Sequence, residues 1–112
     1  MALLPNADKA IVPLEKLRGY SLDSSHPVGK HKARVFASAL GMTGEDAPRL
    51  RVMILQAVLT NEAVEAGTNE HGTRYAVDFQ TLGLKGEVTI RTAWVIDAGE
   101  TIPRLTSCYI RG

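Results

Sequence analysis

The sequence predicts an α+β protein in which about three N-terminal helices pack on a C-terminal antiparallel β-meander of three to four strands. Apolar residues recur with the helical period of about 3.6 up to about residue 60, and with the strand period of 2 from about residue 74. A group of helices followed by a run of strands is typical of the α+β class. The length of 112 residues fits a single domain over 1–112.

The first two helices are predicted from apolar spacing and from residues that start or end helices. A short helix is expected over 13–20, where a proline suits the first helical position. A second helix is expected to begin at Gly29 or Lys30 and to end by Gly41, because glycine readily ends a helix. Its buried face would comprise four residues with helical spacing: Ala33, Phe36, Ala37 and Leu40.

A third helix is expected from near Thr43 to about Thr60. Thr43 and Asp46 have the spacing of a capping box, which marks a helix start. Pro48 is compatible with this helix only if it lies in the first turn. The apolar stripe that follows comprises Leu50, Ile54, Ala57 and Val58.

Three later segments alternate between the two faces of a strand and are predicted to form the meander: 74–82, 87–96 and 102–110. The segment 62–66 is a candidate edge strand. The glycine-containing segments 83–86 and 97–100 are expected to be the connecting turns. Phe79 and Trp94 are expected in the core.

Strict alternation divides the last predicted strand into one face with Leu105, Ser107 and Tyr109 and another with Thr106, Cys108 and Ile110. In the preceding strand, Arg91 shares its face with Thr89 and Ala93, where an arginine need not serve the core. We therefore expect an arginine, a hydroxyl and a phenol together on one face of the sheet.

Composition and charge narrow the classes of function. The net charge is +1, from 13 basic and 12 acidic residues, so an RNA site would have to be a local patch. No apolar run approaches the roughly 18 residues of a membrane span, and the N-terminus lacks the pattern of a signal peptide. The single Cys108 cannot form an internal disulfide. We expect a cytoplasmic protein without membrane contact, or one delivered by a non-classical secretion system.

The stretch HPVGKHKARVF, residues 26–36, is richest in groups that could carry chemistry. His31 would lie in the first turn of the second helix, beside Lys30, Lys32 and Arg34. Basic residues at a helix N-terminus oppose the helix dipole and cost a few tenths of a kcal/mol each, which a bound phosphate would offset. Histidine can also transfer protons near neutral pH. The alternative is a solvated, polar helix start.

The predicted strands supply the second candidate group. Arg91, Ser107 and Tyr109 are expected on one face, and Thr106 adjoins them. With His31 arriving from the helix, this set would suit RNA cleavage without a metal. The histidine would move the proton of the 2′-OH, the arginine would stabilise the charged transition state, and the hydroxyl groups would bind phosphate or assist proton transfer.

Each of these strand residues also has an ordinary structural interpretation. Arg91 could instead form an ion pair with Asp78 or Glu87. Tyr109 could be an amphipathic strand residue without a catalytic role. Taken singly, each residue leaves both interpretations open.

The sequence does not indicate a metal site or a cofactor. The three histidines, His26, His31 and His71, are irregularly spaced, and no cysteine pair accompanies them. No glycine-rich nucleotide-binding loop is present. Cys108 has no motif of a nucleophile around it and is expected to be a small strand residue.

Several segments resemble a bacterial family of small domains of unknown function: LPNADKAIVPLEKLRGYSLDSSHPVGKHKARVFASALG, RYAVDF, TIRTAWVI and PRLTSCYI. The resemblance covers nearly the whole chain, and its most specific part is the pattern HPxGxHKAxxF. Members of this family occur alone and as terminal modules of larger toxin-like or phage-associated proteins.

A wider resemblance links the chain to the barnase–EndoU–colicin–RelE group of ribonuclease toxins. Many of those toxins have a helix with a KH pair, a strand arginine, and a last strand ending in Thr/Ser-x-Tyr. In this sequence the motifs fall on Lys30 and His31, on Arg91, and on Ser107 and Tyr109. The resemblance implies an endoribonuclease that needs no metal.

Two hypotheses follow. In the first, the chain is a metal-independent endoribonuclease toxin with His31 as general acid/base, RNA as substrate and a protein antitoxin or immunity protein as partner. In the second, it is a non-catalytic binding module, either an antitoxin or immunity partner or an accessory protein of a toxin or phage system. The first requires His31 within reach of Arg91 and Tyr109. The second leaves them apart and exposes an apolar patch or an open strand edge.

Overall fold

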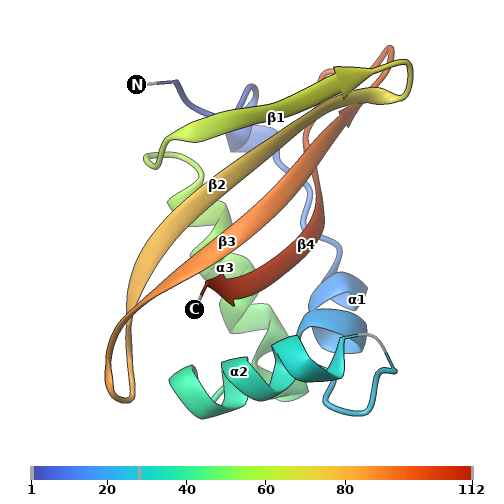
Figure 1. Cartoon of the computed structure of the whole chain (residues 1–112). Coiled ribbons are helices and arrows are strands. Elements are labelled where there is room, and N and C mark those ends of the chain that lie inside the picture. Colours follow the sequence, from blue (N-terminus) through green and yellow to red (C-terminus); the bar gives the residue numbers. More distant parts are fainter. Residues whose placement is uncertain (1, 28, 112) are drawn as a thin grey trace.

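A computed structural model describes residues 2–27 and 29–111 and confirms the α+β class. The elements are η1 (Ala7–Lys9), α1 (Leu14–Lys16), η2 (Leu17–Ser21), α2 (Lys30–Leu40), η3 (Gly44–Asp46), α3 (Ala47–Ala57), β1 (Ala63–Asn69), β2 (Gly72–Gly83), β3 (Gly86–Asp97) and β4 (Arg104–Arg111). η1 and η3 are 3₁₀ turns, and η2 is a π-helical turn. In Figure 1, α3 runs behind the strands and α2 lies below them, so the helices gather on one side of the sheet.

The first predicted helix is divided into two turns of different geometry. α1 is followed by η2, whose last turn closes with a 2.8 Å hydrogen bond from the N–H of Leu22 to the carbonyl of Leu17. This five-residue spacing is the π-helical pattern. Gly19 lies within η2, and glycine is a poor α-helix former.

The second helix follows the predicted boundaries, whereas the third ends at Ala57, before the predicted end at about Thr60. α2 ends at Gly41, which adopts the left-handed conformation with φ of 68°. Ala33 and Phe36 are buried as expected, Leu40 is partly buried against the core, and Ala37 is exposed, so the buried face of α2 is narrower than predicted. α3 begins through η3, where the N–H of Thr43 donates to the Asp46 carboxylate at 2.9 Å and so confirms the capping box.

The four strands form one antiparallel sheet in the order β1-β2-β3-β4. The candidate edge strand at 62–66 is confirmed by β1, which contains an irregularity between Glu65 and Gly67. The predicted turn at 83–86 is the β2–β3 hairpin, where Gly83 pairs with Gly86. The sheet is therefore a simple meander.

The core lies between the helices and one face of the sheet, and Trp94 and Phe79 are part of it. Trp94 is 1% exposed, and its indole N–H donates to the Thr92 hydroxyl at 2.8 Å. That hydroxyl donates in turn to the carbonyl of Val77 at 2.7 Å. The polar groups of this buried pair are thus satisfied within the core.

The last strand departs from strict alternation. Trp94 pairs with Leu105 and Ala93 pairs with Ser107, so Thr106 is an additional residue in β4, as in a β-bulge. Its hydroxyl donates to the carbonyl of Ala93 at 3.1 Å.

The predicted division of β4 into faces is therefore wrong at its start. Leu105 and Cys108 are both fully buried, although alternation assigns them to opposite faces. The bulge reverses the alternation between them, while Ser107 and Tyr109 still share the other face. That other face carries no helix in Figure 1 and is called the uncovered face below. It includes Arg74, Ala76, Asp78, Thr89, Arg91, Ala93, Val95, Arg104, Ser107, Tyr109 and Arg111.

Candidate functional site

The uncovered face is organised in rows that cross the strands. One row consists of Asp78, Arg91 and Tyr109, in which Arg91 is the register partner of both neighbours. We call it the catalytic row, after the role that is only proposed for it below. Two residues further along each strand, Ala76 and Ala93 are register partners and Ala93 also pairs with Ser107. Small side chains therefore separate the catalytic row from the next row, and they leave room above the sheet.

Asp78 binds two arginines in the catalytic row. Arg91 donates to it twice, from Nε to Oδ1 at 2.8 Å and from Nη2 to Oδ2 at 3.1 Å. Arg111 donates from Nη1 to Oδ2 at 2.9 Å. The hydrogen bond from Arg91 is the main cause that lowers the pKa of Asp78 below its ordinary value; partial burial acts in the opposite direction, and Arg111 adds to the lowering.

The ion pair with Asp78, which was the alternative interpretation of Arg91, is thus confirmed. This pair orients the guanidinium but leaves some of its N–H donors free. A guanidinium carries five N–H donors, and the carboxylate takes two of them. The pKa of Arg91 is raised mainly by the hydrogen bond to Asp78 and further by Tyr109, so Arg91 remains a cation.

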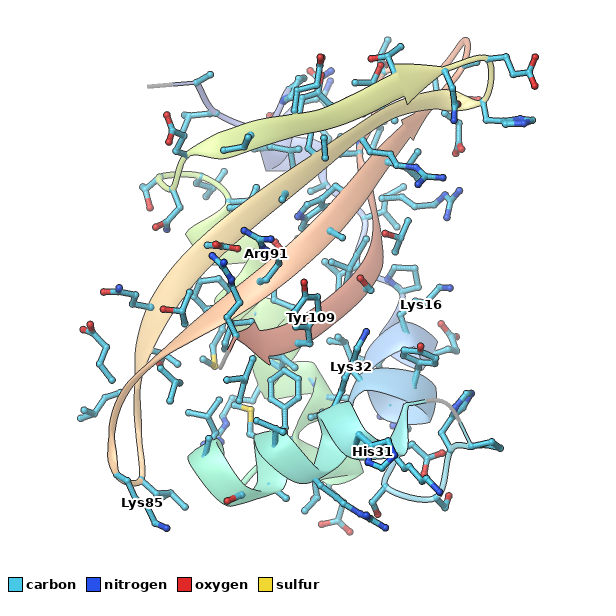
Figure 2. All side chains as sticks on the ribbon, viewed as in Figure 1. Lys16, His31, Lys32, Lys85, Arg91 and Tyr109 are labelled. Carbon is cyan, nitrogen blue, oxygen red and sulfur yellow. The ribbon has the colours of Figure 1, made fainter. Side chains whose placement is uncertain are left out.

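Helix α2 contributes Lys32, not His31, to this site. The Lys32 ammonium lies 4.7 Å from the centre of the Tyr109 ring, which is a cation–π distance. Figure 2 shows Lys32 pointing from α2 toward β4, while His31 lies on the lower side of α2, turned away from Arg91 and Tyr109. The structure therefore brings Arg91, Tyr109 and Lys32 together and leaves His31 exposed and apart.

The remaining residues of the HPVGKHKARVF stretch lie outside the catalytic row. Lys30 is half-buried and Arg34 is exposed on α2, and neither is among the lining residues of the two cavities described next. The N–H of Gly29, just before α2, donates to Nδ1 of His26 at 3.0 Å. His26 also packs edge-on against Tyr20. The histidine at the start of the stretch thus stabilises the entry into α2.

A cavity of about 740 Å³ lies over the uncovered face and extends from the catalytic row toward the β1–β2 hairpin. We call it the arginine cavity, after Arg74, Arg91 and Arg104, which line it together with Thr106 and Ser107. Asp97 is its one carboxylate among the described residues, and His71 lies at its far end. A smaller cavity of about 440 Å³ adjoins Asp78 and Arg91 on the β1 side.

Sequence reasoning missed several residues of this surface. The sequence predicts Asp78 only as an ion-pair partner of Arg91, and it does not single out Arg74 and Arg104 as site residues. Alternation alone places Arg74 on the face of Asp78, so that signal was present. Arg104 could not be assigned in this way, because the bulge at Thr106 lies between it and Ser107.

The other chemical possibilities concern metals, thiols and membranes. Within residues 2–27 and 29–111, no group of three potential metal-ligating side chains is present. Burial raises the pKa of the Cys108 thiol to about 12. In the same part of the chain, none of the helices is both long and apolar enough to cross a bilayer.

Comparison with protein families gives one match over nearly the whole chain. The model of a domain of unknown function, DUF6883, matches residues 3–112. Comparisons with curated proteins and with solved structures give no match.

Proposed function

The chain belongs to the DUF6883 family, and we propose that it is a metal-independent endoribonuclease whose active site is the catalytic row on the uncovered face. The observation that supports this proposal is the order of the row. A carboxylate, a guanidinium and a phenol lie side by side on three neighbouring strands, and Lys32 lies over the phenol ring. Neighbouring strands are about 4.8 Å apart, so Asp78 and Tyr109 flank Arg91 across a span of about 10 Å.

This order suits an in-line displacement at a phosphodiester. The phosphate would bind the free N–H groups of Arg91, between the two flanking side chains. Asp78 would accept the proton of the 2′-OH as its oxygen forms a bond to phosphorus. Tyr109 would give its proton to the 5′-oxygen as the bond from that oxygen to phosphorus breaks. The products are a 2′,3′-cyclic phosphate and a 5′-hydroxyl, and the internal nucleophile makes a metal unnecessary.

Positive charge around the row would stabilise the transition state. Arg91, Arg111 and Lys32 come from β3, β4 and α2, and fixed cations act best where negative charge develops on the phosphoryl oxygens. Ser107 and Thr106 line the arginine cavity next to the row and are proposed to bind the phosphate or sugar. The structure leaves His31 apart from Arg91 and Tyr109, so the requirement set for a ribonuclease with His31 as general acid/base is not met. In this proposal Asp78 and Tyr109 take over the proton transfers, and His31, Lys30 and Arg34 have no catalytic role.

The test is cleavage of a fluorescent RNA oligonucleotide by the purified chain in the presence of EDTA. We expect cleavage that stops when a 2′-deoxy residue replaces the nucleotide at the scissile bond. Arg91→Gln should lower kcat about 100- to 1000-fold, the range for loss of one transition-state donor. Tyr109→Phe should lower it about 100-fold or more, as for loss of a general acid.

His31→Gln is the matched control for Lys32→Met, because the two residues are neighbours on α2 but face different directions. We expect Lys32→Met to lower kcat and His31→Gln to leave it unchanged. If RNA stays intact with the wild-type chain, the ribonuclease proposal fails. If His31→Gln abolishes cleavage while Tyr109→Phe does not, the assignment of the row is wrong.

A toxin role, with a protein antitoxin or immunity partner in the same cytoplasm, is part of this proposal. Induced expression of the wild-type chain should arrest growth with loss of RNA integrity, and Arg91→Gln should relieve the arrest. Intact growth and RNA under wild-type expression would contradict the toxin role.

A binding module is the second candidate function, and two features of the surface favour it. No strand pairs with the outer edge of β1 beyond Ala63 in the part of the chain that the structure describes, and Val64 on this strand is 57% exposed. At the tip of the β2–β3 hairpin, Leu82 and Leu84 are 81% and 68% exposed. Open edges and exposed apolar side chains are typical of protein-binding surfaces. A negative result in the RNA cleavage assay would favour this binding function over the ribonuclease.

A further inference from the structure

We propose that Arg74 and Arg104 form a second phosphate site, so that the ligand of the uncovered face is a single strand of RNA spanning several nucleotides. This inference rests on the proposed RNA ligand and goes beyond the catalytic row. Arg74 and Arg104 both lie opposite Val95, one on each neighbouring strand. Two cations thus converge on one point of the sheet, at the far end of the arginine cavity from Arg91.

Arg104 is held in place in the same manner as Arg91. It donates from Nε to Asp97 Oδ2 and from Nη2 to Asp97 Oδ1, both at 3.2 Å. Two donors are therefore engaged and the remaining N–H groups are available for a ligand. Each end of the cavity thus has an arginine that a carboxylate orients, which lowers the entropy lost when a phosphate binds.

Arg74 supplies further charge at this end. It is exposed, and it forms no ion pair within residues 2–27 and 29–111. Together with Arg91 and Arg104 it makes three cations that line the cavity, where Asp97 is the one carboxylate among the described lining residues. Asp78, just outside the lining, is shared between Arg91 and Arg111, so it does not cancel this excess. The cavity is therefore locally basic, although the whole chain has a net charge of only +1.

The two phosphate sites lie too far apart for one phosphate to reach both. Arg91 and Val95 are four residues apart on β3, which corresponds to about 13 Å along a strand. Between them lie Ala76, Ala93 and Ser107, whose small side chains line the cavity between its two ends. A flexible single strand of RNA can cross this part of the cavity with one phosphate bound at each end.

The far end of the cavity is firmly anchored, so its shape does not depend on a loose hairpin tip. The N–H of His71 donates to Asn69 Oδ1 at 2.8 Å, and its carbonyl accepts the N–H of Ala98 at 2.9 Å. The next residue, Gly72, has φ of 144° and lies so close to the backbone of Ile96 that a Cβ would clash there. The turn between β1 and β2 and the turn between β3 and β4 are thus held together near Arg104.

The test measures binding without cleavage. Labelled 2′-O-methyl oligouridines of two and six nucleotides lack the nucleophile, and their Kd is measured by fluorescence anisotropy at several salt concentrations. We expect the hexamer to bind more tightly than the dimer. The double variant Arg74→Gln/Arg104→Gln should lose this difference, with hexamer binding weakened about tenfold or more, as for hydrogen bonds to a charged group. The salt slope should fall by about 0.7 for each lost phosphate contact.

Arg49→Gln is the matched control, because Arg49 is exposed on α3, on the helical side of the molecule. If this variant weakens hexamer binding as much as the double variant, the attraction is unspecific and the second site is refuted. A hexaglutamate peptide that binds as tightly as the hexamer, with the same sensitivity to Arg74→Gln/Arg104→Gln, would also overturn the inference.

The test separates this inference from the proposed function. A wild-type chain that binds the hexamer through Arg74 and Arg104 but leaves natural RNA intact supports the second site and refutes the ribonuclease. A chain that cleaves RNA equally well with and without Arg74 and Arg104, and binds both oligonucleotides alike, keeps the ribonuclease and refutes the second site.

Discussion

The two faces of the sheet are built from alternate residues of the same strands, but they are stabilised in different ways. On the covered face, Trp94 and Thr92 are buried and satisfy each other by a hydrogen bond. On the uncovered face, Arg91 and Arg104 are each oriented by a partly exposed carboxylate. The covered face therefore provides most of the stability, while the ion pairs of the uncovered face hold charged groups in position and contribute little to folding.

This difference teaches where function can reside in a small domain. A buried polar group must keep its partners, since an orphaned one costs about 1–3 kcal/mol. A half-exposed ion pair can exchange its partner for a ligand at low cost, because solvent already screens it. The arginines of the uncovered face are thus both positioned and available.

The largest expected effect is on the covered face, where Thr92→Val would remove the acceptor of the Trp94 indole N–H. We expect the free energy of unfolding to fall by about 1–3 kcal/mol, because this N–H would be left buried without a partner. Urea unfolding followed by tryptophan fluorescence measures the change. Thr89→Val, the same substitution on the uncovered face, is the control and should change stability by less than about 0.5 kcal/mol. Equal losses for the two variants would show that the faces do not differ in this respect.

A smaller effect is expected on the uncovered face from Asp78→Asn, which removes the partner of Arg91 and Arg111. The stability lost at neutral pH should be about 1 kcal/mol or less, since the pair is partly exposed. The pKa of Asp78 is lowered in the folded state. Its ionised carboxylate therefore stabilises the fold above the ordinary carboxyl pKa of 3.8, and this contribution is lost as the pH falls through the lower, folded-state pKa.

The measurement for Asp78→Asn is the stability of both proteins by urea unfolding from pH 7 down to the most acidic pH at which the wild type remains folded. The difference between wild type and variant should shrink steadily as the pH falls below 3.8. A difference that stays constant with pH would show that the ionised carboxylate is not what stabilises this face.

Much of the fold could be predicted, because periodicity records which side of each element is buried. The end of α2 at Gly41 and the β2–β3 turn follow from local rules about glycine. The bulge at Thr106 could not be predicted, since Thr106 and Ser107 are both polar and strict alternation fits this strand as well as a shifted phase does. The bulge nonetheless decides that Leu105 and Cys108 are buried together.

The candidate site could be predicted only for the sheet. Arg91 and Tyr109 meet as expected from their strand positions. The choice between His31 and Lys32 depended on how α2 rotates about its axis when it packs on β4. Successive helical residues differ by about 100° in direction, so only one of the pair can face the sheet. Lys32 lies one turn before the buried Phe36, and this spacing is the signal that favoured it over His31.

The smallest perturbation compares two neighbouring positions on opposite faces of β4, Ser107 and Cys108. Burial raises the pKa of Cys108 to about 12, so its thiol should not react with a disulfide reagent at pH 8 until the protein unfolds. In the variant Ser107→Cys/Cys108→Ala, the new thiol lies beside the arginine cavity and should react at once. The rate of thiol modification is the measurement. Fast modification of wild-type Cys108 in the folded state would place it on the uncovered face, and would contradict both the bulge at Thr106 and the register that pairs Arg91 with Tyr109.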